Sequence, residues 1–173
     1  MSKAFTREPD TDVPDKLLEL PVPPPPNPVT ERGHRQIVGA IAAIDQRLAS
    51  EAEALGRVGI ERLQRDRRYW AARLATARVT APPDDPEEIG FGSEVTVAWP
   101  GRGEVTLRIV GEDEADPVQG AIGWRAPVAA ALAGYGTGDA VSVQLAGSDV
   151  TLAVLSVRNG PIPLPSGDGT EAS

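Results

Sequence analysis

The sequence predicts an α+β fold, in which a coiled-coil helical hairpin precedes a small antiparallel sheet domain with one short helix. Apolar residues recur at helical spacing in the middle of the chain, whereas apolar and polar residues alternate in its second half. Proline-rich stretches flank the first pattern on both sides. The expected segments are a disordered lead (1–29), the hairpin (30–80), a linker (81–88), the sheet domain (89–158) and a flexible tail (159–173).

The hairpin is expected to begin at Thr30, a good N-cap residue. Its apolar seam has two arms, which read Ile37, Ile41, Ile44 and Leu48, then Ile60, Leu63, Arg67, Trp70, Leu74 and Ala77. Antiparallel pairing places Ile44 opposite Arg67 and the reversal at Leu55–Gly56, within a turn near 53–59. Arms of about 23 residues would be roughly 35 Å long.

The second half predicts two β-hairpins and a helix. Residues 94–99 and 104–110 alternate as half-buried strands, and so do residues 140–145 and 150–157. A short helix is expected from Pro127 to Leu132, because proline suits the first turn of a helix. Together these elements form an antiparallel sheet packed against one helix.

Composition excludes several classes of site. The chain has no cysteine and one histidine, so neither disulfides, thiol catalysis nor a His-rich metal site is expected. No stretch approaches the ~20 apolar residues that span a membrane, and no apolar signal-peptide core follows the first residues. A cytoplasmic protein without a stably bound cofactor or metal is therefore expected.

Charge is divided unevenly along the chain. Residues 31–80 carry 10 basic and 6 acidic side chains, whereas residues 81–173 carry 4 basic and 14 acidic ones. The acidic second half argues against tight binding of duplex nucleic acid through that part. The basic hairpin is suited to nucleic acid or to an acidic channel.

The densest charge lies in one turn of the second half. Four carboxylates, those of Glu112, Asp113, Glu114 and Asp116, precede Pro117. Such density is costly in a small domain unless a positively charged partner meets it. The turn is therefore expected to be a docking surface.

The run from Ile109 to Val141 closely resembles the C-terminal domain of the bacterial GreA/GreB transcript-cleavage factors. The matching residues are Gly111, Glu112, Asp113, Glu114, Ala115, Asp116, Pro117, Gly120, Ile122, Pro127, Ala131, Leu132, Gly134, Gly138 and Asp139. The run departs at Gly123 and Ala126, where the family usually has serine, and the loss of the N-cap at 126 weakens the helix by roughly 1 kcal/mol. The resemblance implies an FKBP-like domain that binds core RNA polymerase at the rim of its secondary channel. The residues implied to bind polymerase are Glu112, Asp113, Glu114, Asp116, Pro117 and Pro127.

In that family the hairpin enters the channel, and acidic residues at its tip help to hold a second magnesium ion. This chain lacks the D-x-x-E-N motif there, and its arms look at least two turns shorter. Its tip carboxylates are Glu51 and Glu53, which as an i, i+2 pair lie about 200° apart on a helix and do not chelate one ion unless the turn unwinds. We therefore expect solubilising charges, no metal site, no catalytic residue, and weak or absent stimulation of RNA cleavage.

A stripe on the second helix has two interpretations. Arg62, Arg65, Tyr69 and Arg73 recur at helical spacing. They either contact RNA, DNA or the channel wall, with Tyr69 available for stacking, or form a solvated face with i, i+4 ion pairs to Glu61 and Asp66.

The resemblance implies a monomeric Gre-type elongation factor that modulates paused or backtracked transcription complexes and is not itself an enzyme. Two alternatives stay open. One is a channel-occupying competitor without cleavage activity, and the other is an FKBP-like isomerase or chaperone unrelated to polymerase.

Overall fold

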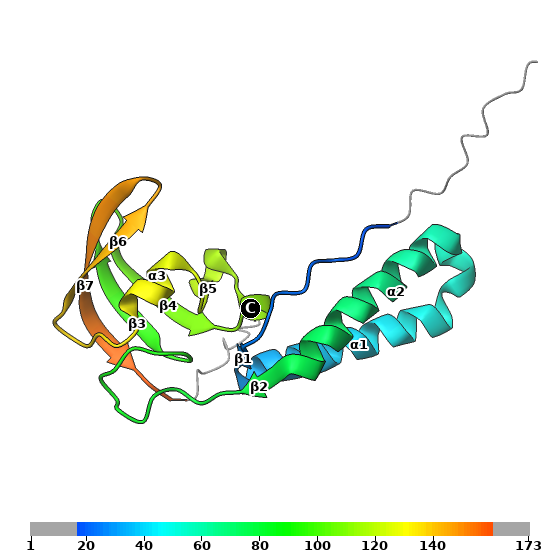
Figure 1. The fold of residues 1–173 in the computed structure, drawn as a ribbon, viewed down its shortest axis with the longest axis horizontal. Helices are drawn as coiled ribbons and strands as arrows, with labels where there is room; N and C mark the ends of the chain where they lie inside the picture. Colours follow the sequence, from blue (N-terminus) through cyan, green and yellow to red (C-terminus); the bar gives the residue numbers. More distant parts are fainter. Residues whose placement is uncertain (1–16, 161–173) are drawn as a thin grey trace, which may run out of the picture.

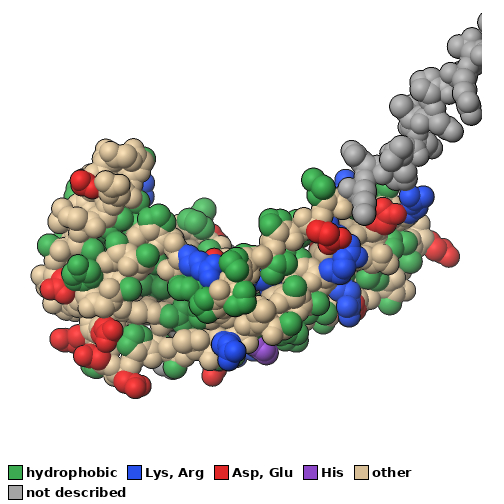
Figure 2. All heavy atoms as spheres, in the orientation of Figure 1, with side chains coloured by type: hydrophobic (Ala, Val, Ile, Leu, Met, Phe, Trp, Pro, Cys, Tyr) green, Lys and Arg blue, Asp and Glu red, His purple; other side chains and the backbone are tan. Residues whose placement is uncertain are grey.

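The structure is a computed structural model that describes residues 17–160. A helical hairpin lies on one side and a curled five-stranded mixed sheet on the other, which confirms the predicted fold class (Figure 1). The surface is hollowed between these two lobes (Figure 2). The parts of the expected lead and tail that fall on residues 1–16 and 161–173 lie outside the described residues.

The hairpin consists of α1 (Glu31–Ser50) and α2 (Ala52–Thr76). The Thr30 hydroxyl accepts a hydrogen bond of 3.0 Å from the Gly33 N–H, so it caps α1 as expected. Gly56, with φ of 62°, interrupts α2, and the short turn before it forms the tip.

One contact between the helices lies close to a predicted pair. Arg67 donates to Asp45 at 2.6 Å, next to the expected pairing of Ile44 with Arg67. The expectation that Arg67 lies in the apolar seam is wrong, because its side chain is 46% exposed and reaches outward to the carboxylate. Ile37, Ile44 and Leu63 form the buried part of the seam.

A two-stranded parallel pair connects the lobes. β1 (Asn27–Val29) pairs with β2 (Ala77–Val79), and Val29 is fully buried. Residues 27–29 were expected in the disordered lead and residues 77–79 in the hairpin, whereas both form short strands. Pairing between three-residue strands so far apart in the chain leaves no local pattern to detect.

The sheet has the strand order β5-β4-β3-β7-β6. Its strands are β3 (Glu94–Trp99), β4 (Gly103–Val110), β5 (Ala121–Gly123), β6 (Ala140–Leu145) and β7 (Ser148–Arg158). All pairs are antiparallel except β4 with β5, which is parallel and was not expected. The acidic turn lies between β4 and the edge strand β5, so the pairing of these two strands holds both of its ends.

The core of the second lobe lies between the sheet and α3 (Pro127–Leu132). Ala129 and Leu132 of α3 pack on buried strand residues, and Trp99 and Trp124 cover the edges of this cluster. Among residues 17–160, no helix combines the length and apolar character that crossing a membrane requires.

Candidate functional site

The acidic turn faces the base of the hairpin. Glu112–Glu114 form a 3-10 turn, η1, immediately after β4. The Glu114 carboxylate accepts hydrogen bonds from the Thr30 hydroxyl and, at 3.2 Å, from the Gly111 N–H. Glu114 thereby connects the start of α1 to the sheet domain.

Arg73 of α2 is the centre of this contact. The side chain is completely buried, and its Nε donates to Asp113 Oδ2 at 2.6 Å. Its Nη2 donates to Asn27 Oδ1 at 2.7 Å and lies 3.4 Å from Glu112 Oε2. A buried guanidinium requires such partners, because an unpaired buried charge is strongly destabilising.

Tyr69 binds the other oxygen of the Asp113 carboxylate. Its hydroxyl donates to Asp113 Oδ1 at 2.6 Å. Burial, and then this hydrogen bond, raise the pKa of Tyr69 to about 12. Both Asp113 oxygens are therefore engaged within the chain, and the Asp113 side chain is only 7% exposed. We call Asn27, Tyr69, Arg73, Glu112 and Asp113 the interdomain joint.

The joint changes the interpretation of two sets of predicted residues. The acidic turn was expected to meet a basic partner molecule, but three of its four carboxylates contact side chains of this chain. Arg73 and Tyr69 were assigned either to a nucleic-acid contact or to a solvated face, and they turn toward the sheet domain instead. The complementary charges were visible in the sequence, although their pairing was not.

The other two residues of the predicted stripe lie apart from the joint. Arg65 pairs with Asp66 at 2.6 Å, and Arg62 is exposed. The expected Glu61–Arg65 pair is replaced by an ion pair between Arg57 and Glu61 at 3.0 Å. Arg62 and Arg65 thus stay on the hairpin surface.

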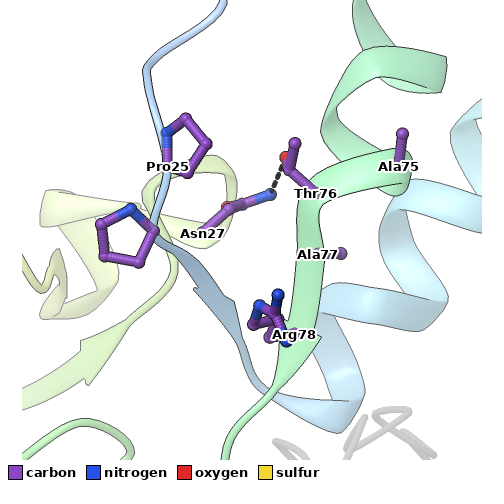
Figure 3. A pocket seen from close by; sticks show the side chains of 7 residues that line it. Pro25, Asn27, Ala75, Thr76, Ala77 and Arg78 are labelled. Carbon is purple, nitrogen blue, oxygen red and sulfur yellow. Dashed lines mark hydrogen bonds between the residues drawn. The ribbon is translucent and has the colours of Figure 1, made fainter.

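Asn27 is a member of the joint that sequence reasoning missed. Its side chain is 1% exposed, and its Nδ2 donates to the Arg73 carbonyl at 3.0 Å and to Thr76 Oγ1 at 3.2 Å. Figure 3 shows Asn27 pointing from β1 toward Thr76, beside a pocket of about 360 Å³. An asparagine between two prolines reads as a turn residue, so its burial left no sequence signal.

The outward side of the acidic turn is open. Asp116 caps the second 3-10 turn, η2 (Pro117–Gln119), by accepting from the Val118 N–H at 3.1 Å. Val118 is 95% exposed, and Pro117 and Pro127 are also exposed. An apolar side chain held this far into solvent contributes little to the fold, so it is free to contact a partner.

The hairpin tip carries isolated charges. Glu51 pairs with Arg47 at 3.2 Å, and Glu53 is exposed. Within residues 17–160, no three His, Cys, Asp or Glu side chains gather in an arrangement that could hold a metal ion.

Comparisons with known proteins agree on one group of relatives. The family model described as transcription elongation factor, GreA/GreB, C-term, matches residues 83–159. The chain is 32% identical to transcription elongation factor GreB of Yersinia pestis over 129 residues, which are 73% of this chain and 74% of that protein. It is 42% identical to transcription elongation factor GreA of Pseudomonas aeruginosa over 92 residues, or 51% of this chain and 58% of that relative. Among solved structures, GreA factor homolog 1 of Thermus thermophilus aligns with a TM-score of 0.37 and 19% identity, covering 78% of this chain and 100% of that one.

Proposed function

Because the chain belongs to the GreA/GreB family of transcription elongation factors, we propose that it binds core RNA polymerase at the secondary-channel rim and modulates elongation of paused or backtracked complexes. The observation that carries this proposal is the interdomain joint. Arg73, buried and held by Asp113, fixes the direction in which the hairpin leaves the sheet domain. A hairpin that must enter a channel while the other domain stays docked requires such a fixed direction.

The docking surface that we propose is the open side of the acidic turn, with Asp116, Pro117 and Val118, together with Pro127. Glu112, Asp113 and Glu114 contribute indirectly, because their carboxylates hold the turn against the hairpin. Alanine replacement of Asp113 and Glu114 would disturb the joint as well as any partner contact. Val118 is the sharper probe, since its side chain is 95% exposed.

We further propose that the protein stimulates RNA cleavage weakly or not at all and has no catalytic activity of its own. Glu51 is held by Arg47 at 3.2 Å, and Glu53 stands alone. Magnesium needs several oxygen ligands in near-octahedral geometry, which one unsupported carboxylate does not supply. The same observation favours a second candidate function, in which the protein occupies the channel and competes with cleavage-competent Gre factors.

The test is the affinity of the full chain for core RNA polymerase, measured with and without a cleavage-competent Gre competitor. Val118→Glu should weaken binding by about tenfold or more, because a charge would replace an apolar contact at the interface. Leu155→Glu is the matched control, since Leu155 is 41% exposed on β7, which β3 and β4 separate from β5 and the acidic turn. Equal affinity of both variants would contradict this docking surface.

A transcript-cleavage assay on backtracked complexes separates the two candidate functions. A competitor should lower the cleavage produced by an active Gre factor in proportion to its own binding. A modulator of the Gre type should change elongation or cleavage when it is the only factor present. Absence of binding to polymerase would refute both.

A further inference from the structure

The proline-rich segment before β1 contacts both lobes. At its beginning, Glu19 accepts hydrogen bonds from Arg68 of α2, at 2.5 and 3.2 Å. Near its end, the Pro24 and Pro26 carbonyls accept from Arg125 Nη2, at 3.0 and 3.3 Å. Arg125 belongs to the sheet domain, so residues 17–26 run from the hairpin to the other lobe before they enter β1. Figure 1 shows this segment beside α2 on its way to β1.

Arg125 is oriented for this contact by two neighbours. Its guanidinium lies 4.8 Å from the centre of the Trp124 ring, a cation–π arrangement. Its Nη1 lies 3.6 Å from Glu112 Oε1, so the acidic turn holds the opposite side of the group. Trp124 in turn packs against the core of the sheet domain. Stacking and pairing together direct Nη2 toward the proline-rich segment.

The segment is chemically suited to such a site. Proline has no N–H group, so a run of prolines satisfies few of its own carbonyls, and these remain available to an external donor. Its restricted backbone also loses little conformational freedom when it is bound. In this site Trp124 holds Arg125 by stacking, and the Arg125 guanidinium makes the hydrogen bonds to the segment.

We propose that Trp124 and Arg125 form a binding site for the backbone of a proline-rich segment, and that its ligand is residues 17–26 of the same chain. When residues 17–26 bind at this site, Asn27 is placed next to Arg73, because β1 begins directly after Pro26. The lead is thus a strap that spans both lobes and ends in the interdomain joint.

The absence of cysteine from the chain allows the test to use the full protein with two engineered labels. Leu20→Cys places a spin label on the strap, and Ala130→Cys places one on an exposed position of α3. The distance distribution between them should be narrow in the otherwise unchanged chain. In Arg125→Ala it should broaden, since a released segment samples a range of roughly 10 Å or more.

Arg102→Ala is the matched control. Arg102 stacks on Trp99 at 5.0 Å in the same way, but makes no contact with the strap. It should leave the distribution narrow. Arg68→Ala frees the Glu19 end next to the label, so combining it with Arg125→Ala releases the segment at both contacts and should broaden the distribution furthest. Unchanged width in Arg125→Ala, with a native circular dichroism spectrum, would overturn the proposal.

A mixture of singly labelled chains identifies the source of the ligand. One chain carries only the label at residue 20 and the other only the label at residue 130. No dipolar signal between them is expected when the strap binds within its own chain. A strong signal would show that a second copy supplies the segment, which contradicts the proposed ligand.

Discussion

Two arginines of α2 hold a carboxylate at the same distance but in different surroundings. In the interdomain joint, Arg73 Nε lies 2.6 Å from Asp113, and the two side chains are 0% and 7% exposed. We call residues 45–67 the distal hairpin. There, Arg67 Nε lies 2.6 Å from Asp45, and the two side chains are 46% and 48% exposed. Arg67 binds Asp45 through two hydrogen bonds, whereas Arg73 gives Asp113 one and directs its Nη2 to Asn27 and Glu112. The exposed pair therefore has the more complete two-atom geometry, and the larger structural role of the Arg73 pair comes from its burial.

Because they differ in burial, the interdomain joint and the distal hairpin differ in how well they tolerate the loss of one partner of the ion pair. Removing one partner of a buried pair leaves a charge without solvent or a counter-charge, whereas an exposed charge is solvated by water. Arg67 lowers the pKa of Asp45 through its hydrogen bond, yet either group remains hydrated without the other. The interdomain joint therefore constrains the orientation of the hairpin. Charged residues of the distal hairpin can be replaced with little loss of stability.

Arg73→Met should have the largest effect. The variant leaves the Asp113 carboxylate buried with Tyr69 as its remaining side-chain donor, so we expect a loss of about 3–5 kcal/mol in the free energy of unfolding. Urea denaturation followed by circular dichroism measures this. Arg67→Met is the control and should shift the midpoint much less. A loss under about 1 kcal/mol for Arg73→Met would refute the importance of burial here.

A second change at the same place sharpens the interpretation. Asp113→Leu combined with Arg73→Met removes both charges, so the double variant should regain part of the stability lost in the single one. If the double variant is as unstable as the sum of the single variants, lost packing rather than an uncompensated charge is the cause.

Tyr69→Phe should have the next largest effect. It removes a hydrogen bond to a charged and nearly buried acceptor, a contribution of about 1.5–3 kcal/mol. The same change should alter the response to alkaline pH. Burial and the Asp113 hydrogen bond raise the pKa of Tyr69 from 10.0 to about 12, so the folded state retains a proton that the unfolded chain releases. Stability from this group is present below pH 10 and is lost as pH rises toward 12.

Absorbance of the tyrosinate ion measures that pKa directly. The chain has two tyrosines, so Tyr135→Phe leaves Tyr69 as the only reporter. A midpoint near 12 is expected in the folded protein. A midpoint at the ordinary value of 10.0 would mean that Tyr69 is neither buried against the sheet domain nor held by Asp113 in solution.

Two glycines of α1 provide a smaller, matched comparison. A Cβ added at Gly33 would overlap the Glu114 carboxylate, which bridges to Thr30, so Gly33→Ala should destabilise by about 1–2 kcal/mol. A Cβ added at Gly39 meets no atom within 4 Å, so Gly39→Ala should stabilise by up to about 1 kcal/mol through helix propensity. Thermal unfolding of both variants tests the opposite signs, and stabilisation by Gly33→Ala would refute the crowding of Gly33 by Glu114.

The tip should show the smallest effect. Glu51→Gln removes an exposed i, i+4 pair with Arg47, and Glu53→Gln removes an exposed charge, so each should change stability by less than about 0.5 kcal/mol. Neither should alter the cleavage activity of a bound polymerase. Cleavage that is strong in the unchanged chain and lost in Glu51→Gln would contradict the proposed inactive tip.

Several elements were predictable from local patterns. The strand 94–99, the helix 127–132 and the strand 140–145 have the expected bounds, because alternation and a proline start are properties of neighbouring residues. β5 was missed because three residues cannot display alternation, and β1 with β2 because their pairing joins distant segments. The acidic turn was recognised as a contact surface, but its principal contact lies within the chain.

The sequence by itself determined the two lobes, the approximate register of the hairpin and the place where charge is concentrated, because periodicity and composition act over a few residues. Only the tertiary structure decided which charges meet. Arg73 and Arg67 lie on the same helix, and the sequence pattern placed Arg67 in the apolar seam and Arg73 on the outward stripe, which is the reverse of what the structure shows. One is buried against Asp113 and the other remains in solvent, because burial depends on what the rest of the chain places over each residue.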